Sequence, residues 1–112
     1  MKVEFLKEVV DKTLSSIRYS LGVKAVEYVR NEDAMHNFNV GSKMTGMIRE
    51  KVLYGFSLKH LISISDIRND IEKGVLPTEK IVEEKYGDAI NYLILEKASV
   101  LERIHKSKNV NN

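Results

Sequence analysis

Apolar residues recur at intervals of three and four along most of this chain, which is the spacing of amphipathic helices. The first stripe predicts a helix over residues 3–21, and Gly22, which lacks a Cβ, marks a kink or a brief break after it. A second helical stretch is predicted over residues 23–30, and Asp33 is placed to cap a short helix over residues 34–45. The first stripe consists of Val3, Leu6, Val10, Leu14, Ile17 and Leu21.

Two longer helices are predicted in the second half of the chain, on either side of its only proline. The apolar spacing predicts one helix over residues 47–72. The segment from Gly74 to Pro77 ends that helix, because proline cannot continue a helical hydrogen-bond ladder. Thr78 is the predicted N-cap of the last helix, whose apolar stripe reaches Ile104.

The length of the chain bounds its organisation. It has 112 residues, of which 43% are hydrophobic and 30% charged, and this is enough for one domain. We predict a single all-α domain, a four- to five-helix bundle, over residues 1–106, followed by a flexible polar tail at residues 107–112. Several wide apolar stripes in so short a chain also predict that a homo-oligomer completes the burial.

Charge and cysteine content restrict the class of function. Eighteen Lys and Arg against sixteen Asp and Glu leave a net charge of +2, which gives no strong signal for nucleic-acid binding. The chain contains no cysteine, so it has neither disulfides nor thiolate metal sites. It also lacks the roughly 18 consecutive apolar residues of a membrane span. We therefore expect a cytoplasmic protein without a membrane partner.

Two lines of polar residues interrupt the long helices. One line is made of Lys59, Ser63, Asp66 and Asp70, and the other of Glu84, Asp88 and Asn91. Helices joined by a short turn usually pack antiparallel, so the two lines could face each other and hold a metal ion or a phosphate. A polar line is more often the solvated face of a helix, and this second interpretation stays open.

A mixed polar and aromatic cluster lies upstream of these lines. Lys24, Glu27 and Tyr28 share one predicted helix face, and His36, Asn37 and Phe38 follow shortly after. In one interpretation Phe38 packs into the core at a helix end. In the other, aromatic rings stack a nucleobase while lysine and asparagine hold phosphate or sugar. The chain has no histidine spacing typical of zinc sites and no glycine-rich phosphate-binding loop.

Three strings of residues resemble small helical proteins of bacteriophages and prophages. The strings are KAVEYVRNEDAMHNFNVGSKMTG, SLKHLISISDIRND and EEKYGDAINYLILEKA, all within residues 22–103. Such proteins are similar to the nucleotide modification associated domain, which remotely resembles the all-α nucleotide pyrophosphohydrolases of the MazG type. The first helix and the tail lie outside the resemblance.

The resemblance implies a protein that binds a nucleotide or a nucleotide-derived signalling molecule. The departure of its carboxylates from the enzyme pattern predicts binding without turnover and without a cofactor. In the cytoplasm of a bacterial host, such a protein could sequester that molecule against host defence. Its lysines would neutralise phosphates, and its aromatic rings would stack a base. The ligand-binding residues implied by the three strings are Lys24, Glu27, Tyr28, His36, Asn37, Phe38, Lys59, His60, Asp66, Glu84, Lys85, Asp88, Asn91 and Tyr92.

Two alternative functions remain. The first is a MazG-type enzyme, in which carboxylates hold the Mg²⁺ ions that grip a triphosphate and activate water. Its metal ligands would be Glu27, Asp66, Glu84 and Asp88, but the spacings here are D-x-x-x-D and E-x-x-x-D, and Lys85 stands where the enzyme pattern has a carboxylate. The second alternative is a protein-interaction module that inhibits a host factor through an exposed helix face.

Overall fold

The computed structural model of the protein describes residues 1–23, Arg30 and residues 33–110. All regular structure in this part of the chain is helical and contains no strand, so the all-α prediction is confirmed. The elements are α1 (Val3–Arg18), a π-helical turn (Tyr19–Val23), α2 (His36–Thr45), α3 (Arg49–Glu72) and α4 (Glu79–Val110). None of these helices has both the length and the apolar character that crossing a membrane requires.

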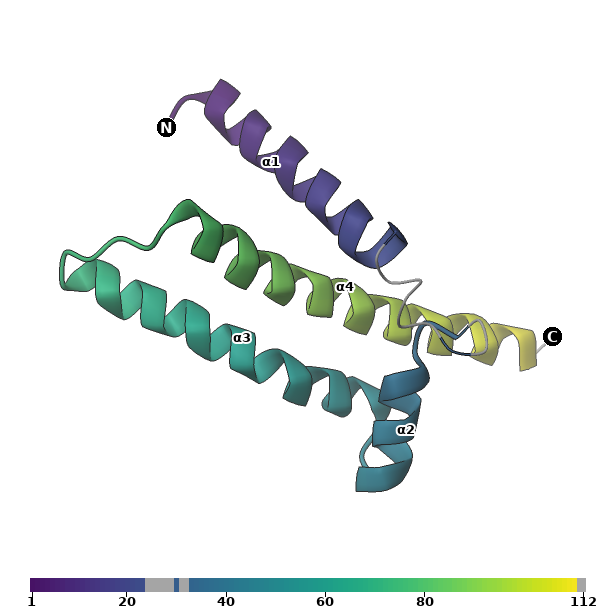
Figure 1. Ribbon diagram of the computed structural model, residues 1–112. Helices are drawn as coiled ribbons and strands as arrows, with labels where there is room; N and C mark the ends of the chain where they lie inside the picture. The colour runs from purple at the N-terminus through teal and green to yellow at the C-terminus, as the bar shows by residue number, and fades with distance from the viewer. Residues whose placement is uncertain (24–29, 31–32, 111–112) are drawn as a thin grey trace.

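Helices α3 and α4 lie antiparallel, side by side, and form the body of the molecule (Figure 1). The turn between them follows from local sequence chemistry. Gly74 adopts a φ of +82°, in the left-handed region that glycine favours, and Pro77 precedes α4. The Thr78 hydroxyl accepts a hydrogen bond from the Ile81 N–H at 3.3 Å, so the predicted N-cap is confirmed.

The first half of the chain differs from the prediction in its helix boundaries. The α-helical hydrogen bonding of α1 ends at Arg18, and a π-helical turn continues through Gly22, where glycine was expected to weaken the helix. Helix α2 begins at His36, two residues later than predicted. Asp33 nevertheless accepts a hydrogen bond from the Met35 N–H at 2.9 Å. The helix predicted over residues 23–30 falls almost entirely outside the described residues.

The last helix is longer than its apolar stripe. Helix α4 continues to Val110, so residues 107–110 are helical where we predicted a tail. The polar C-terminal end of α4 is stabilised by Lys108 in its last turn, because a positive charge there complements the helix dipole. Lys106 also lies 3.4 Å from the Glu102 carboxylate, one turn earlier in the same helix.

The apolar core lies mainly between α3 and α4. Its buried apolar side chains, among the described residues, are Met35, Val52, Leu53, Ile64, Ile67 and Ala89. Helix α1 buries none of its residues. It converges with α4 near the C-terminal end of α1 and diverges from it toward the N-terminus (Figure 1). The apolar stripe predicted for the first helix is therefore present but mostly uncovered.

Helix α2 approaches α3 closely at Gly41. A Cβ built on Gly41 would lie 2.9 Å from Cγ1 of Val52, which is buried and stiff because it is β-branched. We expect Gly41→Ala to destabilise the protein by about 1 kcal/mol, because overpacking outweighs the better helix propensity of alanine.

The matched control is Gly55→Ala in α3, where an added Cβ would meet nothing within 4 Å. This substitution should stabilise the protein by up to about 1 kcal/mol, since alanine is the better helix former. Urea unfolding measures both changes, and effects of the same sign would contradict the proposed close approach.

Candidate ligand-binding cleft

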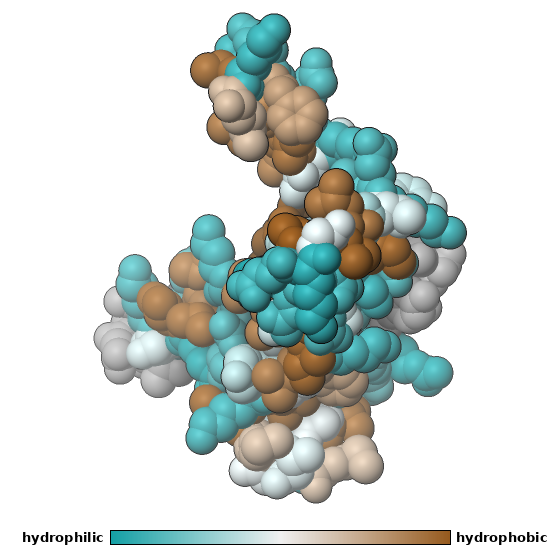
Figure 2. All heavy atoms as spheres, turned by 90° about the vertical axis from the view of Figure 1, so that its left-hand side faces the viewer, coloured by the Kyte–Doolittle hydropathy of each residue, from teal (hydrophilic) through white to brown (hydrophobic). Residues whose placement is uncertain are grey.

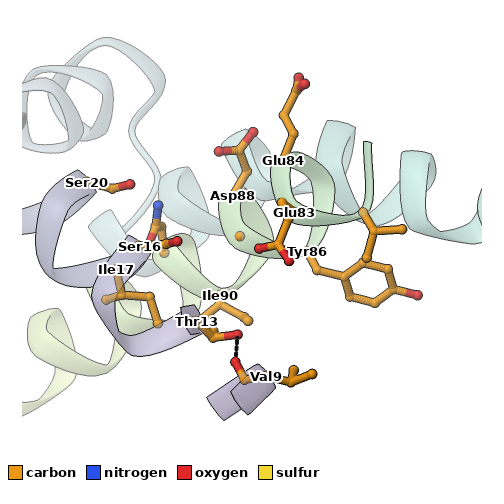
Figure 3. Close-up of a pocket in the computed structure, with 13 residues that line it drawn as sticks. Val9, Thr13, Ser16, Ile17, Ser20, Glu83, Glu84, Tyr86, Asp88 and Ile90 are labelled. Atoms are coloured by element: carbon orange, nitrogen blue, oxygen red, sulfur yellow. Dashed lines mark hydrogen bonds between the residues drawn. The ribbon is translucent and has the colours of Figure 1, made fainter. Parts of the chain in front are cut away.

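A cleft of about 450 Å³ lies between α1 and the first half of α4 (Figure 3). Its volume falls within the range of small-molecule sites. Apolar side chains and three hydroxyl groups form the α1 wall, which consists of Val9, Thr13, Ser16 and Ile17 of α1 and Ser20 of the π-helical turn that follows it. The α4 wall carries three carboxylates and an amide, and consists of Val82, Glu83, Glu84, Tyr86, Gly87, Asp88, Ile90 and Asn91.

Two lysines beside the cleft form ion pairs with carboxylates of its α4 wall. The Lys12 Nζ lies 3.6 Å from the Glu83 carboxylate, and the Lys85 Nζ lies 3.6 Å from that of Glu84. Ion pairs at a protein surface are worth about 0–1 kcal/mol. Giving up either ion pair therefore costs little, and a phosphate group could become the partner of either lysine where the displaced carboxylate turns away from it.

Asn91 provides a buried hydrogen-bond acceptor at the cleft wall. Its side-chain oxygen is inaccessible to solvent and has no hydrogen-bond partner among the described residues. An unpaired buried polar atom costs about 1–3 kcal/mol. A bound molecule could recover this energy only if the Asn91 amide turned its oxygen into the cleft, because solvent does not reach that oxygen as it stands. Glu84, Asp88 and Asn91 were predicted as one polar line, and the structure places all three at this wall.

Asp88 also contacts the interface between α3 and α4. Its Oδ2 lies 3.5 Å from Nδ1 of His60, without the geometry of a hydrogen bond. The His60 ring stacks on Tyr92, with 5.4 Å between the ring centroids. Burial, and to a lesser extent the charge of Asp88, raises the pKa of the Tyr92 phenol. Tyr92 is therefore neutral at physiological pH and behaves as part of the interior.

Phe38 belongs to the same aromatic group. Its ring meets Phe56 edge to face at 5.6 Å and Tyr92 at 6.4 Å between centroids. Phe38 does not line the cleft. This arrangement supports the interpretation in which Phe38 packs into the interior at the end of a helix rather than stacking a base.

The other predicted site residues are dispersed. Lys59 and Asp66 are exposed on α3, Asn37 is exposed on α2 and His36 is half-buried there. Lys24, Glu27 and Tyr28 lie outside the described residues. The two polar lines do not face each other as one surface, because α3 turns His60 toward Asp88 and leaves Lys59 and Asp66 in solvent.

The described residues do not assemble a magnesium centre. No group of three or more His, Asp or Glu side chains in this part of the chain is arranged to hold a metal ion. Four carboxylates were predicted as Mg²⁺ ligands under the alternative of a MazG-type enzyme. Of these, Glu84 and Asp88 line the cleft and Asp66 is exposed on α3. Glu27 lies outside the described residues.

Sequence analysis did not predict the α1 wall of the cleft, because the resemblance begins only at residue 22. A signal was nevertheless present. Thr13, Ser16 and Ser20 follow one another at i, i+3 and i+7, so their hydroxyl groups share one face of the helix. The Thr13 hydroxyl donates to the Val9 carbonyl at 2.7 Å (Figure 3).

An ionic network with a buried centre, which sequence analysis also missed, joins the start of α3 to the second half of α4. Arg49 donates from Nε to the Ser99 hydroxyl at 2.7 Å and from Nη2 to the Glu102 carboxylate at 3.0 Å. The fully buried Ser99 hydroxyl in turn donates to Glu50. Arg103 donates from Nε to both Glu50 oxygens, at 2.9 and 2.8 Å. Every group at the centre of this network is paired, so we assign it a structural role.

Comparisons of the chain with models of protein families, with curated proteins and with solved structures return no match. The resemblance to the nucleotide modification associated domain therefore stays a prediction from the three quoted strings.

Proposed function

We propose that the protein binds a nucleotide or a nucleotide-derived molecule in the cleft between α1 and α4, without turning it over. The sequence resemblance supports the class of ligand, and the geometry of the cleft supports the place. The observation that carries the place is a cleft of about 450 Å³ whose α4 wall brings together Glu84, Asp88 and Asn91, three of the residues that the resemblance implies. A cleft of this volume, with a few polar groups among apolar side chains, is typical of a small-molecule site.

The walls of the cleft suit different parts of such a ligand. The N–H groups of a base can donate to the Asp88 carboxylate, and apolar side chains such as Ile90 can contact its faces. Phosphates suit Lys12 and Lys85, whose present partners are surface carboxylates. Because those carboxylates would repel phosphate inside the cleft, we propose that the base enters first and the phosphates stay at the margin.

We also propose the biological role that the resemblance implies, which is sequestration of a host signalling nucleotide by a phage-type protein in the bacterial cytoplasm. That role rests on the three strings alone. Completion of the four- to five-helix bundle by a further copy of the chain is likewise a proposal, and it rests on the apolar surface that α1 leaves uncovered.

Isothermal titration with nucleosides and with mono-, di- and cyclic nucleotides tests the proposed binding. We expect one of these classes to bind, and Asn91→Ala to weaken its binding by about 10-fold, because the change removes a polar group from the cleft wall and with it one hydrogen bond to the ligand. The matched control is Asn69→Ala, which truncates an exposed asparagine of α3 and should leave the affinity unchanged.

A second variant, Gly87→Ala, should change the affinity for the ligand and the stability of the protein in opposite directions. Gly87 lines the cleft, and a Cβ built on it would meet nothing within 4 Å, so close helix packing does not explain this glycine. Gly87→Ala should stabilise α4 by up to about 1 kcal/mol while reducing the space for the ligand and hence its affinity. Absence of heat for every ligand, with the helical content confirmed by circular dichroism, would remove the proposal.

A further inference from the structure

The chain exposes far more surface than a compact protein of its mass. Its accessible surface is 8926 Å², whereas a compact monomer of 12.8 kDa exposes about 6,300 Å². The radius of gyration of its Cα atoms is 16.9 Å, against about 13 Å for a compact domain of this length. The excess surface of about 2,600 Å² is close to the roughly 1,000–2,500 Å² that one subunit of an obligate homodimer buries.

Helix α1 carries part of the uncovered apolar surface, and α3 and α4 also expose large apolar side chains such as Ile62 and Leu93. Val3, Leu6, Val10 and Leu14 form one stripe along α1, and each of them is at least 43% exposed. Figure 2 views the molecule from the side toward which α1 and α4 diverge. It shows α1 as an arm above the body, with brown, apolar side chains on the arm and a hollow beneath it. Such a stripe is stable in water only when something covers it.

Charge indicates what covers the stripe. The polar positions of α1 carry both signs in equal number, namely Lys7, Lys12 and Arg18 with Glu4, Glu8 and Asp11. An amphipathic helix that binds a lipid surface has a predominantly cationic polar face, which α1 lacks. Alternating signs can instead pair with the opposite signs of an identical helix.

We propose that the apolar face of α1, defined by Val3, Leu6, Val10 and Leu14, is the interface of a two-fold symmetric homodimer. Two-fold symmetry places the same patch of one protomer against that patch of its partner. The apolar face of each α1 would then be covered by the α1 of the other protomer. The excess surface of the whole chain favours a second copy over a short peptide, and α1 is a helix that buries no residue within its own chain.

The proposed dimer would also change the shape of the cleft. Val9 lines the cleft and is 44% exposed, and its neighbour Val10 belongs to the proposed interface. The partner subunit would therefore lie beside the α1 wall and narrow the open side of the cleft. The dimer itself does not depend on whether the cleft binds a nucleotide.

Analytical ultracentrifugation across a wide range of concentrations tests the interface. The protein should sediment as a dimer, and Val10→Glu should weaken association by about 100-fold or more, because a two-fold interface would bury two uncompensated carboxylates. The matched control is Ser15→Glu, which adds the same charge to an exposed position across the same helix and should leave the dimer intact. Since α1 buries no residue within its own chain, both variants should keep their helical content.

Hydrogen exchange provides a readout that needs no substitution. Amide exchange in α1 should slow as the protein concentration rises, because association protects a helix that is uncovered in the single chain. A monomeric mass at every concentration would overturn the proposal. So would a dimer that survives Val10→Glu, or a monomer whose α1 becomes protected only on phospholipid vesicles.

Discussion

Leu53→Ala is expected to lower the free energy of unfolding by about 3 kcal/mol. Leu53 is 1% exposed and lies where α3 meets α4, close to Ala89 and Tyr92. Truncation removes apolar atoms that are fully buried and leaves a cavity that two long helices cannot easily close. Because small domains have a total stability of about 5 kcal/mol or little more, this single change should bring the protein close to unfolding.

Leu58→Ala is the matched control for this prediction. It makes the same chemical change in the same helix, but Leu58 is 39% exposed, so we expect a loss of less than about 1 kcal/mol. Urea unfolding of both variants should be followed at one fixed protein concentration, because dimer formation would link stability to concentration. Equal losses at the two positions would mean that Leu53 is not the centre of the core.

Acidification from about pH 4.5 to about pH 2 is expected to destabilise the protein through Glu50. The hydrogen bonds from Arg103, and then the one from Ser99, lower the pKa of the Glu50 carboxyl from 4.5 to about 2. A carboxyl whose pKa is lower in the folded state binds fewer protons there, so its contribution to stability is complete above pH 4.5 and is lost as the pH falls toward 2.

The expected loss is about 2 kcal/mol. The full difference between the two pKa values corresponds to about 3 kcal/mol, and solvent around the half-exposed side chain of Arg103 reduces it. Glu50→Gln should therefore be less stable than the natural chain by about 2 kcal/mol at neutral pH and equally stable near pH 2.

Thermal unfolding across this pH range measures the prediction, with Glu72→Gln as the control. Glu72 is an exposed carboxyl at the end of the same helix, and its replacement should change stability by less than about 0.5 kcal/mol. If the stability of Glu50→Gln fell with pH as steeply as that of the natural chain, the acid sensitivity would come from other carboxyls.

Helix type and several helix ends were predictable because they depend on residues that are neighbours in the chain. Gly74 and Thr78 act through their own backbone and the next turn, so the α3–α4 connection appears where the sequence predicts it. The cleft was less predictable. The spacing of Glu84, Asp88 and Asn91 shows that they share a helix face, but no local pattern shows which helix lies opposite, and that helix is α1.

The buried network shows the same limit. Arg49 and Ser99 are separated by fifty residues, and each alone is typical of a solvated helix position. Only their contact explains why an arginine and a serine are buried together.

The sequence by itself therefore determined an all-α chain, the helical hairpin turn and the apolar stripes, since periodicity and capping act over a few residues. The tertiary structure alone decided which stripe is buried. Helices α3 and α4 cover each other, whereas α1 meets α4 near only one end and keeps its apolar face in solvent. Burial depends on which surfaces pack together across the whole chain, and a helix carries no local signal for its partner.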